Sequence, residues 1–190
     1  FIKQNSLTKG GMTLFNKEDQ ENILKKLHNH TVKISSGGSA ANTIHGVSVL
    51  GGQSYYLGRV ANDLNGRHYS EDMKSCGVGF PGTGDAPSTT GTCVILVSPD
   101  GERTMLTHLG ISSSLEPSNI DELIIRNARM AYIEGYLWTG EETRAAALKL
   151  AEIAKKNKLP VAFTLSDAFV VNSFKNQITD FIRLNVDILF

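Results

Sequence analysis

The 190-residue chain lacks an excess of either charge, because 19 lysines and arginines balance 19 aspartates and glutamates. A balanced chain has no electrostatic footprint for nucleic acid or for an anionic membrane. No apolar run approaches the length that spans a bilayer, and we expect no secretory leader. We therefore expect neither nucleic acid nor membrane as a partner, but small molecules or other proteins.

Cysteine is scarce, and the spacing of Cys76 and Cys93 fits neither a metal site nor a CxxC redox motif. Such cysteines are typical of buried, reduced thiols in a cytosolic protein, so we expect a cytoplasmic location. The histidines at positions 45, 68 and 108 form no metal-ligand spacing either. The sequence therefore predicts no metal site within these residues.

Short apolar runs rich in β-branched residues alternate with helix-period segments from Thr31 onward. This alternation predicts an α/β fold with a mainly parallel sheet, helices on both of its faces and ligands at the carboxyl ends of strands. We expect strands within 31–35, 54–60, 130–138, 159–165 and 186–190, and helices within 18–29, 40–50, 66–75 and 171–184.

Residues 91–110 follow a different pattern. Two alternating apolar runs are joined through Asp100-Gly101, a dipeptide that favours a tight hairpin turn. We expect an antiparallel hairpin beside the parallel sheet, with strands that are not deeply buried on both faces.

The stretch SSGGSAANTI, residues 35–44, joins an expected strand to an expected helix. Gly37 and Gly38 leave the backbone bare, and the first amides of the helix are unpaired. The stretch has neither the GxxxxGK[ST] pattern of a phosphate loop nor the GxGxxG spacing of a dinucleotide site. With Asn42 and no lysine, it suits a neutral, hydroxyl-rich ligand. The alternative is purely structural, with a tight turn and an asparagine that caps or packs within the helix.

Several motifs occur in an order that resembles one family. The stretch GGSAANTIHGVSVLGGQSYYLGRVANDLNGRHYSEDMKSCGV (37–78) is similar to the first signature of the PfkB family of ribokinase-like carbohydrate kinases. PSTTGTCVILVSPDGERTMLTHLG (87–110) resembles the lid of its adenosine-kinase-like and sugar-kinase branches. AYIEGYLW (131–138) and VDILF (186–190) resemble landmarks of the same branches, so the resemblance covers nearly the entire chain.

The resemblance implies a three-layer α/β/α fold with a small antiparallel β lid. It also implies a kinase that transfers the γ-phosphoryl group of ATP, with Mg²⁺, to a primary hydroxyl of a sugar or of a nucleoside such as adenosine. In that interpretation Gly37, Gly38, Ser39 and Asn42 bind substrate hydroxyls, and Glu134 contacts the sugar. The alternative for Glu134 is a solvated or capping carboxylate at a strand end.

The segment that resembles the family's lid spans approximately residues 85–110 and includes Arg103. Arg103 would reach toward substrate or phosphate as the lid closes and excludes water from the reacting groups. The alternative is a surface arginine paired with Glu102. Exposed strand edges of the lid would also allow a homodimer.

The family's second signature matches nothing in this chain. That signature is an Asp-Thr-x-Gly-Ala-Gly-Asp helix start that supplies the catalytic base and an anion hole. The magnesium-linked Asn-x-x-Glu motif is expected after a strand such as VDILF (186–190), beyond the end of these residues, and the aspartate of the family's first strand is expected before their beginning. We therefore expect residues 1–190 to be the N-terminal part of one kinase domain, incomplete at both ends. It would hold no catalytic residue, with ATP and Mg²⁺ bound elsewhere, and alone it would be inactive and poorly soluble.

Two other functions are weighed against a kinase. A non-catalytic sugar-binding or regulatory module would keep the fold without the chemistry. A dinucleotide-dependent dehydrogenase is disfavoured by the missing GxGxxG motif and by the hairpin. Within the kinase interpretation, the residues favour no single sugar or nucleoside.

Overall fold

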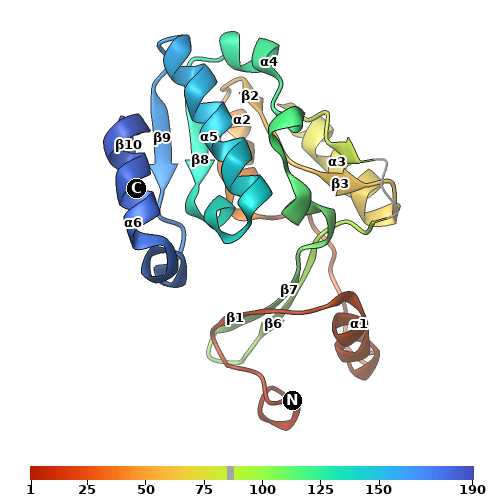
Figure 1. Ribbon diagram of the computed structural model, residues 1–190. Coiled ribbons are helices and arrows are strands. Elements are labelled where there is room, and N and C mark those ends of the chain that lie inside the picture. The colour runs from red at the N-terminus through yellow and green to blue at the C-terminus, as the bar shows by residue number, and fades with distance from the viewer. Residues whose placement is uncertain (85–87) are drawn as a thin grey trace.

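The computed structural model describes residues 1–84 and 88–190 (Figure 1). Residues 85–87, the first three of the expected lid, lie outside the described residues. The chain forms a larger α/β body and a small lobe that lies beneath it in this view, with the N-terminus next to the small lobe. Within the described residues, no helix combines the length and the apolar character needed to cross a bilayer.

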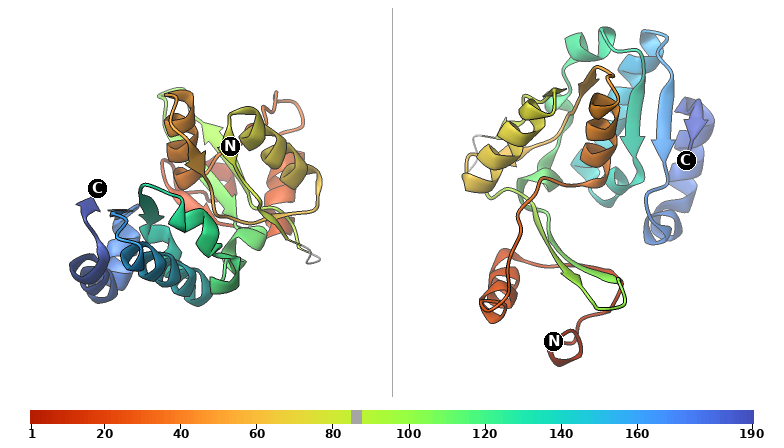
Figure 2. Two further views of the ribbon diagram at one scale, coloured as in Figure 1. Left: turned by 90° about the horizontal axis from the view of Figure 1, so that it is seen from above. Right: turned by 180° about the vertical axis from the view of Figure 1, so that it is seen from behind.

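The body has helices on both faces of its strands (Figure 2). Its strands are β2 (Ser54–Tyr55), β3 (Val60–Ala61), β4 (Val78–Gly79), β5 (Thr83–Gly84), β8 (Ala131–Glu134), β9 (Val161–Thr164) and β10 (Ile188–Leu189). One face is covered by α2 (Ser39–Val49) and α3 (Leu64–Ser75), and the other by α5 (Glu141–Lys156) and α6 (Ala168–Asn185), with α4 (Glu122–Arg126) packed beside α5. Short 3-10 helices are Lys3–Asn5, Gly110–Ser114, Pro117–Asn119 and Gly135–Thr139.

The strand pairs of the body are parallel. β9 lies between β10 and β8, while β2 pairs with β4 and β3 pairs with β5. In the register of β8 and β9, Ala131 is opposite Val161 and Glu134 is opposite Thr164. Because parallel strands end at the same edge of a sheet, Glu134 and Thr164 mark the carboxyl edge where ligands are expected.

The core of the body lies between β8, β9, α5 and α6. Trp138, Phe163 and Phe181 pack edge to face, with ring centroids 4.7–5.3 Å apart. Ala147 and Ala151 of α5 are both 1% exposed, and their spacing of four residues puts them on the helix face that meets the strands. Small alanines on this face let α5 approach the sheet closely.

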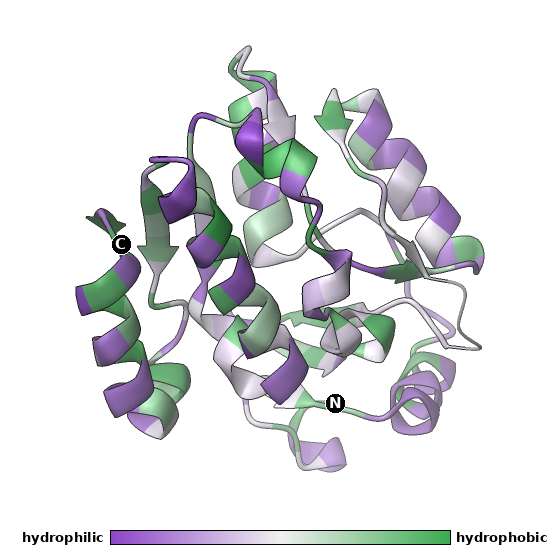
Figure 3. Ribbon diagram, turned by 45° about the horizontal axis from the view of Figure 1, so that its top comes forward, coloured by the Kyte–Doolittle hydropathy of each residue, from purple (hydrophilic) through white to green (hydrophobic). Residues whose placement is uncertain are grey.

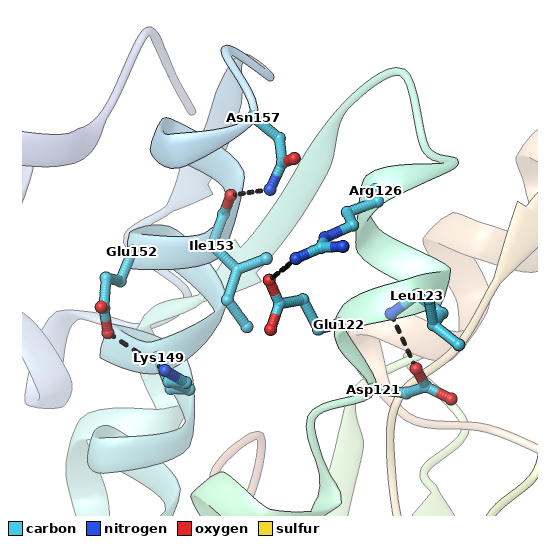
Figure 4. Close-up of polar contacts among 8 residues, drawn as sticks. All are labelled: Asp121, Glu122, Leu123, Arg126, Lys149, Glu152, Ile153 and Asn157. Atoms are coloured by element: carbon cyan, nitrogen blue, oxygen red, sulfur yellow. Dashed lines mark hydrogen bonds and ion pairs between the residues drawn. The ribbon is translucent and has the colours of Figure 1, made fainter.

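Hydrophilic residues occur along the outer faces of several body helices (Figure 3). Figure 4 shows hydrogen bonds and ion pairs at the ends and on the surfaces of α4 and α5. Asp121 caps α4 by accepting from the Leu123 amide at 2.8 Å, and Glu122 pairs with Arg126 at 2.5 Å. Exposed pairs of this kind contribute little to stability, so the body depends on its core.

The small lobe comprises residues 12–26 and 92–108. Its three strands, β1 (Met12–Leu14), β6 (Thr92–Val97) and β7 (Arg103–His108), lie in the order β1-β7-β6, and α1 (Lys17–Lys26) covers one face. β6 and β7 are antiparallel, which confirms the expected hairpin, and Gly101 turns between them at φ 85°. β1 is parallel to β7, so the sheet is mixed rather than purely antiparallel.

Gln20 of α1 holds the small lobe together. Its amide nitrogen donates to the carbonyls of Leu106 (2.8 Å) and Thr92 (3.1 Å), and its amide oxygen accepts from the Thr92 hydroxyl at 2.6 Å. The Gln20 side chain is 5% exposed, so these three bonds satisfy a buried amide. They connect α1 to both strands of the hairpin.

Two strand predictions are wrong in detail. Residues 31–35 form no strand, because this segment runs from the small lobe to α2 without a neighbouring strand, and Val32 and Ile34 are 60% and 69% exposed. The expected strand at 54–60 is two short strands, β2 and β3, because its two ends pair with different partners. The other expected strands and helices are present with shifted ends.

Candidate substrate site

The loop before α2 leaves its backbone open. Gly38 has φ 106° and ψ 142°, a conformation that residues with a side chain rarely adopt, and it directs the chain into α2. No side chain caps this helix start. A Cβ at Gly37 would meet no protein atom within 4 Å, so the packing of the protein does not require glycine there. The open space suits a ligand that approaches the main chain.

Glu134 lies beside this loop, at the carboxyl end of β8. The Ser39 hydroxyl, on the first residue of α2, donates to Oε1 of Glu134 at 2.7 Å. The Tyr132 hydroxyl donates to the same oxygen at 3.2 Å. Glu134 is 6% exposed, so it is a buried acid that the structure joins to the glycine loop.

The surroundings of Glu134 contain hydroxyl groups rather than cations. None of the ion pairs among the described residues includes Glu134. Burial raises the pKa of Tyr132, and the charge of Glu134 raises it further, although nearby Thr43 and Thr164 oppose this shift. Burial also raises the pKa of Tyr136, and the charges of Asp167 and Glu134 add to this effect. Two carboxyl side chains, Glu134 and Asp167, therefore lie close enough to these tyrosines to influence their pKa values.

Asn42 lies one helical turn after Ser39, on the same side of α2. It is exposed, and among the described residues its side chain makes no hydrogen bond. It therefore does not cap or pack within the helix, as the structural alternative required. Its amide can both donate to a ligand and accept from one.

Arg103 lies apart from the other predicted residues. It is exposed and begins β7 opposite Val97, next to the hairpin turn. His108 ends the same strand. At roughly 3.3 Å per residue, the Cα atoms of Arg103 and His108 lie about 17 Å apart. Among the described residues, Arg103 forms no ion pair with Glu102 or any other acid. The structure thus brings Ser39 and Glu134 together and leaves Arg103 near the turn of the hairpin.

Tyr132 is a site residue that the sequence prediction missed. Residues two apart in a strand point to the same face, so Tyr132 and Glu134 share a face of β8. The spacing of two residues between Tyr132 and Glu134, within an expected strand, is the signal by which the sequence could have identified Tyr132. No comparable pattern indicates the contact of Glu134 with Ser39, which is 95 positions away.

Asp63 connects the body to the start of β6. It caps α3 by accepting from the Gly66 amide at 2.8 Å, and it accepts from the amide (2.9 Å) and the hydroxyl (2.6 Å) of Thr90. Burial opposes the ionised form of Asp63, but the hydrogen bonds from Thr90 and Gly66 outweigh it and lower its pKa. Asp63 thus fixes the point where the chain leaves the body for the small lobe.

The chain matches a known family over nearly all of its length. A family model described as pfkB family carbohydrate kinase matches residues 12–190. The chain belongs to this family. The PfkB chain is also similar to a solved adenosine kinase from Sinorhizobium meliloti, at 34% identity and a TM-score of 0.91. This match covers 100% of the chain and 58% of that protein, and it confirms the ribokinase-like α/β fold expected from the sequence.

Curated relatives of this PfkB chain have names of two kinds. A 5-dehydro-2-deoxygluconokinase of Halalkalibacterium halodurans is 28% identical over 145 residues, which are 68% of this chain and 40% of that protein. A guanosine-inosine kinase of Escherichia coli (strain K12) is 27% identical over 200 residues, which span 100% of this chain and 46% of that protein. The chain thus spans about half the length of these curated relatives or less.

Proposed function

We propose that the protein containing this chain is an ATP-dependent kinase that phosphorylates a primary hydroxyl of a sugar or nucleoside. The observation that carries the proposal is the hydrogen bond from Ser39 to Glu134. It joins the open glycine loop to the carboxyl edge of the sheet. Membership of the PfkB family and similarity to both sugar and nucleoside kinases support the same reaction class.

The proposed acceptor site has the groups that hydroxyl recognition needs. A sugar hydroxyl both donates and accepts hydrogen bonds. The bare amides at Gly37 and Gly38 would donate to it, the Asn42 amide would do both, and Glu134 would accept. Ser39 holds Glu134 beside the loop and keeps lone pairs of its own for a ligand.

Phosphoryl transfer needs further groups. Among the described residues, no cluster of three or more histidine, cysteine, aspartate or glutamate side chains could hold a metal ion. We propose that ATP and Mg²⁺ bind to parts of the protein outside these 190 residues. When bound, they would supply the phosphoryl group and neutralise its charge. A contact from Arg103, a homodimer through the hairpin and a cytoplasmic location remain predictions.

The proposal is tested with the full-length protein. ATP turnover is measured against a panel of neutral sugars and nucleosides, and we expect at least one to be phosphorylated. A protein that binds such a compound but never turns it over would support the non-catalytic binding module instead. No binding and no turnover with any compound of the panel would contradict both.

Asn42→Ala tests the site itself. Removing the amide is expected to weaken substrate binding by about 1–3 kcal/mol, because hydroxyl partners lose a hydrogen bond in a desolvated site. Asn176→Ala is a matched control, since Asn176 is also an exposed asparagine on a helix but lies on α6. Equal affinities for the two variants would show that Asn42 does not contact substrate.

A further inference from the structure

A pocket lies at the amino edge of the strands, opposite the edge that carries Glu134. It has a volume of about 520 Å³ and is formed where α5 and α6 end and where β9 and β10 begin. This volume is within the range of pockets that bind small molecules. At roughly 3.3 Å per residue, the Cα atoms of Val161 and Thr164, at the two ends of β9, lie about 10 Å apart. The pocket is therefore separate from the proposed acceptor site.

The lining of this pocket is mainly positive. Lys155, Lys158 and Arg183 supply cations, and Asp187 is the acid among the lining residues. One oxygen of Asp187 is already engaged, since it accepts from the Val161 amide at 2.8 Å. In the described part of the chain, no ion pair includes any of the three cations. Their charges are thus available to a ligand.

The helix ends at the pocket reduce its positive charge but do not cancel it. The C-terminus of a helix carries about half a negative charge, and both α5 and α6 end here. Lys155 offsets one of these ends directly, because its ammonium donates to the Leu184 carbonyl in the last turn of α6. Two helix ends and Asp187 together still carry less charge than the three cations. The net charge of the lining therefore favours an anion.

Lys158 is the cation that the helix ends do not explain. It follows α5 with φ 58°, in the left-handed region where glycine or asparagine ordinarily ends a helix. The amide of Lys158 donates to the Lys155 carbonyl, and that of Leu159 donates to the Ala154 carbonyl, both at 2.9 Å. The backbone thus makes an ordinary helix end, but with a lysine that strains it. Strained residues occur preferentially where a protein binds a ligand.

We propose that this pocket binds a small polyanion, a molecule with two or more phosphate or carboxylate groups. Arg183 can hold one such group through two parallel hydrogen bonds, and the two lysines act as point charges. The cations lie on three segments, which are the last turn of α5, the turn after it and the last turn of α6. A molecule with several charged groups suits this arrangement. The inference does not depend on the proposed function, because binding is measured without turnover.

Binding of pyrophosphate and of citrate to the full-length protein is measured by calorimetry, without Mg²⁺ or ATP. We expect saturable binding of at least one, and the tighter of the two shows whether phosphate or carboxylate is preferred. Arg183→Ala should weaken this binding at least about tenfold, because charge-assisted hydrogen bonds are lost.

Lys156→Ala is the matched control for Arg183→Ala. Lys156 is also an exposed cation in the last turn of α5, but it does not line the pocket, and its charge acts on Glu122 of α4. We expect its replacement to leave the affinity unchanged. The inference would be overturned by a lack of binding, by binding that Arg183→Ala leaves unchanged, or by equal weakening in both variants.

Lys158→Gly separates binding from folding. Glycine relieves the left-handed strain, so the urea midpoint of unfolding should rise. The affinity for the polyanion should fall about tenfold or more, because a cation is removed from the pocket. A lysine with only a structural role would not give these opposite effects. An unchanged affinity would contradict the proposed site.

Chemical labelling locates the bound anion. Acetylation of Lys158 by acetic anhydride, followed by mass spectrometry, should slow in saturating pyrophosphate or citrate, whereas Lys156 should react at an unchanged rate. This protection reports on the pocket alone, even where a second anion binds elsewhere in the full-length protein. Equal reactivity of Lys158 with and without the anion would overturn the inference.

Discussion

The body around β8 and β9 is covered on both faces of its strands, whereas the sheet of the small lobe is covered on one. In the body, Phe163 is completely buried and packs against aromatic rings from two other elements. In the small lobe, Leu106 is also completely buried, under α1, but Ile95 and Val97 on the other face are 49% and 68% exposed. The body thus buries apolar side chains on both faces of its strands, whereas the small lobe buries them on one face and exposes them on the other.

This difference separates stability from binding. Apolar burial is the main favourable contribution to folding, so the body supplies most of the stability. The small lobe buries one face and depends on polar contacts at Gln20 and Asp63 for its position. Its open apolar face contributes little to folding, because Ile95 and Val97 remain 49% and 68% exposed.

The largest expected effect is the truncation of the body core. Phe163→Ala should lower the free energy of unfolding by about 3–5 kcal/mol, because it removes a fully buried ring and leaves a cavity. Urea unfolding of the full-length protein measures the change. Ile95→Ala in the small lobe is the comparison, with an expected loss below about 1 kcal/mol because the side chain is half exposed. Similar losses for the two variants would show that the regions do not differ.

The difference between the regions was only partly predictable from the sequence. The alternation Cys93, Ile95, Val97 indicated a hairpin with one open face, and Asp100-Gly101 located its turn. β1 was missed because three residues carry too little pattern, and its identity as a strand depends on pairing with β7. Residues 31–35 show the opposite error. Their β-branched residues favour an extended conformation, but these residues form no strand because no other strand pairs with them.

The site was predictable where it is local in sequence. The glycine pair and Asn42 form one short motif, so their openness follows from residue type and from the expected helix start. The contact between Ser39 and Glu134 depends on how α2 packs against β8, which no local pattern records. The two bonds from Thr90 to Asp63 are likewise tertiary, although Asp63 as a helix cap is local.

A moderate effect is expected from Asp63→Ala. The change removes a helix cap and both bonds to Thr90, so about 1–2 kcal/mol of stability should be lost. Hydrogen exchange should become faster in α3 and in the hairpin of the small lobe, but not in β8 and β9. Asp121→Ala, which removes only the cap of α4, is the matched control and should affect α4 alone. Faster exchange throughout the body would contradict the local role of Asp63.

The hydrogen bonds that Asp63 accepts predict that the stability of the protein depends on pH. The pKa of Asp63 is lower in the folded protein than in the unfolded chain, because the bonds from Thr90 and Gly66 outweigh burial. Its stabilising contribution is therefore fully present above about pH 4 and is lost as the pH falls through the lower folded value. The stability difference between wild type and Asp63→Asn should shrink over that acid range. A difference that stays constant down to pH 2 would rule out this linkage.

The smallest effect on stability is expected on the open face of the small lobe. Val97→Ser replaces a side chain that is 68% exposed, so the free energy of unfolding should change by less than about 0.5 kcal/mol. If this face exists for binding, the same variant should change substrate affinity or self-association more than it changes stability. Val49→Ser is the control, since Val49 is 69% exposed at the end of α2. Titration of substrate and light scattering of both variants measure these effects. A stability loss above 1 kcal/mol would mean that the face is covered in the full-length protein, because only burial gives a valine that much influence on folding.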